Sequence, residues 1–251
     1  MKKFTIIFLF PLLLLSCSSN KYVWINYSVN NVPVSEKVET IPISVNFHIL
    51  SDNRANIEEN KILFTEPHLI TINEKKYCFN SEQHYRQDSV VTQISRLFVK
   101  HANKVKLFTQ TSLNESIGNE YYLTGTLNSF YGEQEFSTAA DAGNAAGVVA
   151  GVLFGVIGGA IAGGIAGGIA GAATSNMKTP GKIIIEMSDL KLFKNNGTLV
   201  KDFGSFFQEY KGDFREDGTC WCIYENVNVM LKDFNAKLIE KIREELEGVA
   251  F

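Results

Sequence analysis

A stripe of eight glycines at an unbroken spacing of four constrains this chain more than any other sequence feature. The stripe consists of Gly143, Gly147, Gly151, Gly155, Gly159, Gly163, Gly167 and Gly171. Glycine costs about 1 kcal/mol relative to alanine in a water-exposed helix, so local propensity does not explain the pattern. On a helix, the stripe would form a groove without side chains, along which a second helix can approach closely, as in GxxxG association within membranes. The segment therefore predicts membrane association or close helix packing.

The residues between these glycines are mostly apolar, and no charged residue lies between Asp141 and Lys178. One straight helix over this run would be about 50 Å long, which exceeds the roughly 30 Å hydrocarbon core of a bilayer. Because we expect strands on both sides, the insert (residues 139–177) should leave and return to one place. This favours a helical hairpin that bends near Gly158 and Gly159. Helix packing in a soluble oligomer and a low-complexity loop remain as alternatives.

The N-terminus has the pattern of an export signal. A basic start at Lys2 and Lys3 precedes an apolar stretch and then Ser16 and Cys17, which predicts a signal peptide over residues 1–16. The run from Leu14 to Cys17 resembles the lipobox of bacterial lipoproteins. The resemblance implies that Cys17 becomes the first mature residue and carries acyl chains, which anchor a protein stably when several are present. The absence of Asp after this cysteine implies the outer membrane.

Residues 17–39 are polar and rich in Asn and Ser, so we expect a lipidated tether between the membrane and the fold. Removal of the signal peptide leaves 22 basic and 27 acidic residues, a formal charge of −5. A nucleic-acid surface needs clustered Lys and Arg, so this balance argues against nucleic-acid binding.

The chain contains four cysteines, of which Cys17 is assigned to the lipid. An exported protein meets an oxidising compartment, so Cys78 could pair with either Cys220 or Cys222, leaving one thiol. The pair Cys220 and Cys222 lacks the CxxC spacing and a second pair of ligands, so no metal site is predicted.

Hydrophobic periodicity predicts an α/β (α+β) domain over residues 40–136 and 179–251. Apolar residues alternate along residues 43–49, 120–136, 183–193 and 199–210, which indicates strands, and a shorter strand is expected over 69–72. Asn195, Asn196 and Gly197 favour a hairpin turn. Helical spacing marks two amphipathic helices, over about 90–101 and 227–246, and Asn80 with Gln83 resembles a capping box. This order predicts a two-layer sandwich with an antiparallel or mixed sheet.

A strand followed by Asp52, Asn53 and Arg54, then a helix, then a strand such as Tyr121–Leu127, resembles the YajG-type and ABC-transporter-auxiliary bacterial lipoproteins. The resemblance implies a small α/β domain that faces the periplasm. We expect Asp52 and Arg54 to fix a turn or to contribute to binding. The insert departs from that pattern and resembles the glycine-zipper segments of other bacterial envelope proteins.

The sequence shows no GxSxG, HExxH, Walker A or paired CxxC motif, and its four histidines share no ligand spacing. We therefore expect no enzyme, no catalytic residue and no cofactor. The predicted function is a structural or accessory binding role in transport or envelope assembly, exerted through membrane lipid and through protein partners or a homo-oligomer. The alternative is a homo-oligomeric pore, similar in architecture to the curli-secretion channel family.

Overall fold

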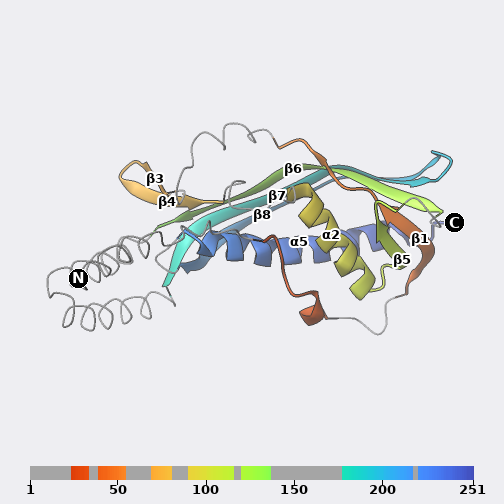
Figure 1. Cartoon of the computed structure of the whole chain (residues 1–251), viewed down its shortest axis with the longest axis horizontal. Helices are drawn as coiled ribbons and strands as arrows, with labels where there is room; N and C mark the ends of the chain where they lie inside the picture. The colour runs from red at the N-terminus through yellow and green to blue at the C-terminus, as the bar shows by residue number, and fades with distance from the viewer. Residues whose placement is uncertain are drawn as a thin grey trace, which may run out of the picture.

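The computed structural model describes residues 24–33, 39–54, 69–80, 90–115, 120–136, 177–216 and 220–251. Within these ranges the chain is an α+β fold, with one mostly antiparallel eight-stranded sheet and two long helices (Figure 1). Cys17 and all eight glycines of the stripe lie outside the described residues, so their predicted roles stay predictions.

Three long strands form an antiparallel ribbon along the length of the molecule. These are β6 (Tyr121–Glu135), β7 (Met177–Lys194) and β8 (Leu199–Glu216). The predicted hairpin turn between β7 and β8 is confirmed: Gly197 has a φ of +84° and its N–H donates to the carbonyl of Lys194 at 2.8 Å. β8 continues past its predicted end at Tyr210 because Phe214 and Glu216 still point into the fold.

The shorter strands line the other edge of β6. β1 (Ile41–Phe47) and β2 (Ser51–Asp52) run parallel to β6, and β5 (Phe108–Leu113) runs parallel to β1. Farther along the same edge, β4 (Lys75–Phe79) pairs antiparallel with β6 and with β3 (Leu69–Ile72). The sheet is therefore mixed, one of the two arrangements that the sequence predicts.

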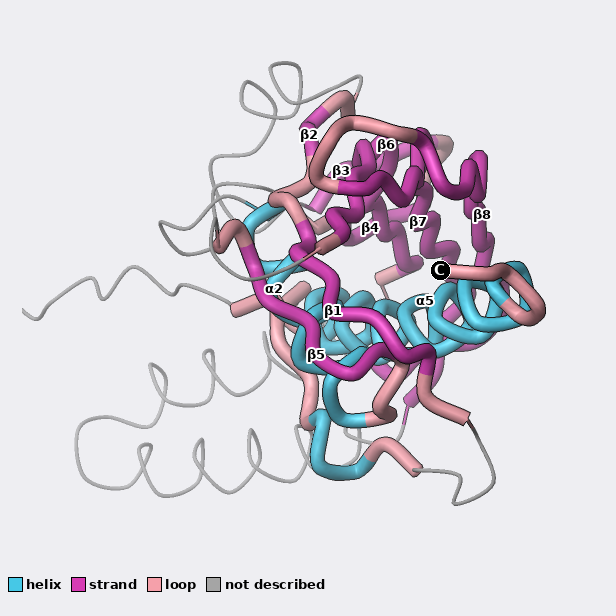
Figure 2. The backbone as a smooth tube through the Cα atoms, turned by 90° about the vertical axis from the view of Figure 1, so that its right-hand side faces the viewer, coloured by secondary structure: helices cyan, strands magenta, loops and turns pink. Residues whose placement is uncertain are grey.

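Both helices lie on the same side of the β6–β7–β8 ribbon, as the two perpendicular views show (Figures 1 and 2). They are α2 (Val90–Lys104) and α5 (Cys222–Leu246). The predicted apolar stripe of α5 is buried at 2% exposure or less, and consists of Val227, Leu231, Phe234, Leu238, Ile242 and Leu246; Met230, also predicted on this stripe, is only partly buried. In the described part of the chain, no helix has both the length and the apolarity that a bilayer crossing requires.

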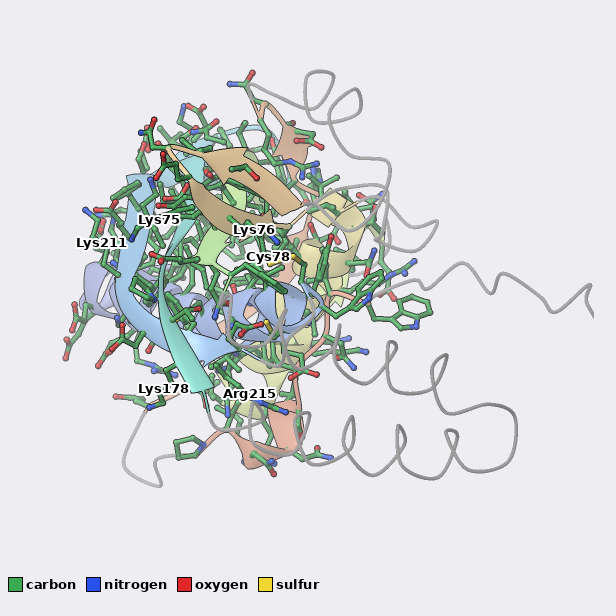
Figure 3. All side chains as sticks on the ribbon, turned by 90° about the vertical axis from the view of Figure 1, so that its left-hand side faces the viewer. Lys75, Lys76, Cys78, Lys178, Lys211 and Arg215 are labelled. Atoms are coloured by element: carbon green, nitrogen blue, oxygen red, sulfur yellow. A yellow bond between two sulfur atoms is a disulfide. The ribbon has the colours of Figure 1, made fainter. Side chains whose placement is uncertain are left out.

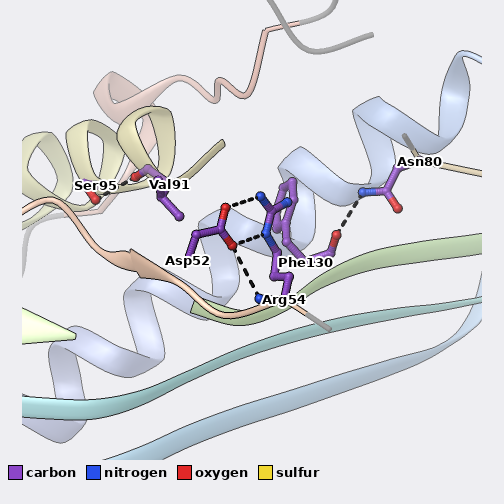
Figure 4. A network of polar contacts seen from close by, with 6 residues as sticks. All are labelled: Asp52, Arg54, Asn80, Val91, Ser95 and Phe130. Atoms are coloured by element: carbon purple, nitrogen blue, oxygen red, sulfur yellow. Dashed lines mark hydrogen bonds and ion pairs between the residues drawn. The ribbon is translucent and has the colours of Figure 1, made fainter. Parts of the chain in front are cut away.

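The side chain of Asn80 joins the end of β4 to β6: Nδ2 donates to the carbonyl of Phe130 at 3.1 Å, and Oδ1 accepts from the N–H of Gly132 at 2.6 Å. Figure 4 shows the first of these contacts. Residues 81–89, where the predicted helix start would lie, are outside the described residues, so the capping role of Asn80 stays a prediction.

The described part of the predicted tether also belongs to the fold. Ile25 is 3% exposed and its N–H donates to Oε1 of Gln93 in α2 at 2.9 Å. Val32 is buried just after the short 3-10 helix η2 (Val29–Asn31). Single apolar residues among Asn and Ser give no periodicity, so the sequence did not reveal that residues 24–33 pack on the helices.

Candidate functional site

The two ends of the glycine-rich segment emerge at one end of the sheet, which we call the insert end. Residues 137–176 separate β6 from β7, and these strands are antiparallel neighbours in which Gln134 lies opposite Gly181. Phe136, just after β6, is buried and its N–H donates to the carbonyl of Lys76 at 2.8 Å. The described residues on the two sides of this segment therefore belong to adjacent strands.

A disulfide joins the insert end to α5. Cys78 in β4 is bonded to Cys220, with Cα atoms 5.2 Å apart and 142 positions between them in sequence. Both half-cystines are buried in a cluster with Phe136. The pairing resolves the alternative that the sequence left open, and Cys222, which is buried, takes no part in this disulfide. The crosslink encloses the whole glycine-rich segment within its loop and fixes β4 beside the start of α5.

Gln134 is the polar centre of the insert end and is only 1% exposed. Its Nε2 donates to Oγ1 of Thr179 in β7 at 3.0 Å, and to the carbonyls of Phe214 and Arg215 in β8 at 3.0 and 2.8 Å. Its Oε1 accepts from Nδ2 of Asn226 in α5 at 2.9 Å. One side chain thus holds three strands and a helix together, and a buried network satisfied in this way specifies a unique arrangement.

Close backbone contact at this end requires glycine. A Cβ at Gly181 would lie 2.7 Å from the carbonyl oxygen of Glu133 and 2.8 Å from the ring of Phe214. β6 and β7 can therefore pair closely here only because residue 181 has no side chain.

Basic side chains surround the insert end in Figure 3, where Lys75, Lys76, Lys178, Lys211 and Arg215 are labelled. Three of these basic side chains form ion pairs with carboxylates: Lys75 with Glu135 at 2.9 Å, Lys211 with Glu209 at 2.9 Å, and Arg215 with Glu225 at 3.4 Å. The hydrogen bond with Glu135 raises the pKa of Lys75. Exposed pairs of this kind contribute about 0–1 kcal/mol each. The described side chains thus make the insert end a surface of mixed charge.

Asp52 and Arg54, the predicted turn or binding residues, contact each other. Nε and Nη2 of Arg54 donate to the two carboxylate oxygens of Asp52 at 2.8 and 2.6 Å (Figure 4). β2, which contains Asp52, pairs with Thr126 and Leu127 in the middle of β6. The structure does not bring this pair to the insert end.

The two histidines that the structure describes, His48 and His101, have different surroundings. His48 stacks on Tyr122, with ring centroids 4.9 Å apart, and His101 lies buried against Tyr27. His68 and His84 lie outside the described residues. Among the residues that the structure does describe, no three His, Cys, Asp or Glu side chains form a group that could hold a metal ion.

Sequence reasoning missed Gln134 and Asn226. The sequence signal for Gln134 was its position in the alternation of β6. Gln134 follows Phe130 and Gly132 at a spacing of two and therefore falls on the inward face of the strand. A polar residue in an inward position predicts a buried hydrogen-bond network, but its partners in β8 and α5 lie 80 to 92 positions away in sequence.

No family model and no curated protein matches the chain. Among solved structures, the chain is similar to the crystal structure of protein XCC0632 from Xanthomonas campestris, which is described with the family model DUF330. The TM-score is 0.46 and the identity 8%, over 88% of this chain and 95% of that chain. Similarity at this level establishes neither a family nor an activity for this protein.

Proposed function

We propose that this protein is a lipid-anchored component of the bacterial envelope, with a structural or accessory binding role in transport or envelope assembly. One observation carries the proposal: the strands that precede and follow residues 137–176 in sequence are paired, at an end braced by a disulfide and by Gln134. Disulfides persist in oxidising compartments, so the Cys78–Cys220 bond supports an exported domain. Cys17 would carry the lipid, and the domain would face the periplasm from the outer membrane.

We propose further that the domain is a two-layer sandwich and that the insert forms a glycine-rich helical hairpin. Because β7 begins at Met177, the hairpin would end before that residue, one position earlier than the sequence predicts. A segment whose ends are fixed on neighbouring strands has to return to its starting point, which a hairpin achieves. Glycines at a spacing of four would then permit close contact between the two helices, or with helices of a second chain. Apolar residues between the glycines would face lipid or a protein partner.

The second candidate function is a homo-oligomeric pore, in which inserts from several subunits line a membrane passage. The same fixed hairpin favours it, because a ring of such domains would present all inserts on one side. The two functions predict different native masses for the protein in gentle detergent. A single subunit or a small complex supports the accessory role, and a large closed homo-oligomer that disappears when residues 142–174 are deleted supports the pore.

The lipid anchor is tested with Cys17→Ser, using Cys222→Ser as the matched control that removes a cysteine elsewhere. We expect Cys17→Ser to accumulate as uncleaved precursor or to leave the membrane fraction, and Cys222→Ser to behave as wild type. Mass spectrometry of the mature N-terminal peptide should show fatty acid on Cys17. An unmodified Cys17 in the wild-type protein would overturn the anchor.

The hairpin is tested by comparing substitutions that all stay apolar. Gly155→Leu and Gly163→Leu add bulk to the glycine stripe, whereas Val152→Leu and Ile161→Leu nearly conserve volume. Close packing predicts that the glycine variants alone lose cross-links between the two halves of the insert or between subunits. Equal tolerance of all four changes would favour a low-complexity loop.

A further inference from the structure

A groove of about 550 Å³ runs along α5, on a part of the fold that the proposed function does not use. The C-terminal half of α2 and the segment that ends at Pro33 form its other walls. Its apolar surface includes Val105, Ala236 and Ile239. Small-molecule sites in proteins commonly have this volume and an apolar lining with a few polar groups.

One wall of the groove is His101, whose ring contacts the Tyr27 hydroxyl, which is itself hydrogen-bonded to Asn235. Nδ2 of Asn235 donates to the hydroxyl oxygen of Tyr27 at 2.8 Å, and the Tyr27 hydroxyl contacts Nδ1 of His101 at 3.0 Å. No other described group accepts from this hydroxyl, so donation to Nδ1 is the arrangement that satisfies its proton. The neutral imidazole then carries its proton on Nε2. His101 is 1% exposed, and Nε2 has no hydrogen-bond partner among the described residues.

The charge of His101 is settled by its surroundings. Burial, together with the positive charge of Lys232, lowers the pKa of His101 to about 4. The imidazole is therefore neutral near pH 7 and acts as a hydrogen-bond donor through Nε2, beside an ammonium group.

The groove has an excess of positive charge at Lys232. The described contact of Lys232 is a long one, 3.4 Å from Nζ to the carbonyl of Asn31. Asp233 is already engaged by Lys237 at 2.8 Å and by the Tyr210 hydroxyl at 2.9 Å.

Arg243 and Glu240 line the opposite end of the groove. Burial lowers the pKa of Arg243, and the negative charge of Glu240 partly offsets that effect. Lys232 and Arg243 are eleven positions apart on α5, about 16 Å along the helix axis, with Ala236 and Ile239 between them.

We propose that this groove binds an amphipathic organic anion, with a carboxylate or phosphate headgroup at Lys232 and His101 and an apolar chain along Ala236, Ile239 and Val105. The headgroup oxygen accepts from Nε2 of His101 and from Nζ of Lys232, which supplies the missing partner of a buried donor. The chain covers apolar surface over the length of groove that leads toward Arg243. The inference is independent of the membrane role proposed above.

The test is calorimetric titration of the full-length protein in a non-ionic detergent with dodecanoate, dodecyl phosphate and dodecanol. We expect saturable binding of at least one of the two anions, and binding of dodecanol weaker by about tenfold or more, because charge-assisted hydrogen bonds to the headgroup are lost. Absence of binding by both anions overturns the site. Equal binding of dodecanol also overturns it, since apolar partition alone would then explain the affinity.

Three variants locate the binding. Ala236→Phe fills the groove from an exposed position and should abolish binding without unfolding the protein. Lys232→Gln should weaken anion binding by about fivefold to tenfold while leaving dodecanol unaffected. Lys211→Gln removes an equal charge from the exposed face of β8 and should bind as wild type. Wild-type affinity in Ala236→Phe would place the ligand elsewhere and contradict the proposal.

Discussion

Gly132 of β6 lies directly against Val227 of α5: a Cβ at residue 132 would be 2.6 Å from Cγ2 of Val227. Ile223 is the next neighbour, 3.3 Å from the same point. The helix can therefore approach the sheet closely only at a position without a side chain. This contact fixes the depth at which α5 packs near the insert end.

The contact predicts that Gly132→Ala destabilises the fold. Overpacking in a well-filled core costs about 1–3 kcal/mol, which denaturant unfolding measures. The matched control is Gly212→Ala in β8, where an added Cβ meets nothing within 4 Å; it should change stability by no more than about 0.5 kcal/mol. If both substitutions have the same small effect, α5 does not pack against Gly132.

Gln134→Leu should destabilise the protein by about 2 kcal/mol or more. Leucine has a similar volume but leaves Oγ1 of Thr179 and the carbonyl of Phe214 without the donor that Gln134 provides, and each buried polar group left unpaired costs about 1–3 kcal/mol. Gln110→Leu, on the exposed face of β5, is the control and should be nearly neutral. A neutral Gln134→Leu would mean that water replaces the network at no cost.

The disulfide should account for about 2–5 kcal/mol of stability, the usual loss when a native crosslink is removed. Wild-type protein is expected to unfold at lower denaturant concentration in the presence of a thiol reductant. Cys78→Ala should reproduce that loss and no longer respond to the reductant, whereas Cys222→Ala should retain the response. An unchanged unfolding midpoint on reduction would contradict a stabilising role of the crosslink.

The elements with strong periodicity were predictable from the sequence. Alternation over residues 120–136 identified β6, and apolar residues at helical spacing identified both helices, because burial on one face imposes these periods. β4 gave no such signal, since Lys75 and Lys76 begin it and only its last two residues are buried. Its place is set by pairing with β6, where Tyr77 lies opposite Glu135.

The site was less predictable than the fold. The sequence narrowed the disulfide to two pairings. The choice of Cys220 over Cys222 depends on how the chain turns into α5, because Cys220 lies just before the helix and Cys222 is its first residue. The packing of Tyr27 against His101 likewise joins segments 74 positions apart, and no local sequence pattern predicts it. Long-range polar contacts leave no period in a sequence, whereas buried apolar faces do.

His101 should make stability depend on pH below neutrality. Its pKa is about 4 in the fold and about 6.5 in an unfolded chain, because burial and Lys232 oppose protonation. Between these values the unfolded state binds more protons, so the unfolding free energy rises with pH. The contribution of His101 is thus fully present above about pH 6.5 and is lost as the pH falls toward 4.

Between about pH 6.5 and pH 4, the unfolding free energy should fall by roughly 3 kcal/mol because of His101, at about 1.4 kcal/mol for each unit of pKa difference. Denaturant unfolding at pH 7.0 and pH 5.0 measures the slope for the wild-type protein and for His101→Gln, which cannot titrate. His101→Gln should be less stable at pH 7, because it disrupts the contact with Tyr27, but should lose less stability on acidification. If His101→Gln loses as much unfolding free energy between pH 7.0 and pH 5.0 as the wild-type protein does, other groups cause the pH dependence. His101 would then be protonated at its ordinary pKa in the fold.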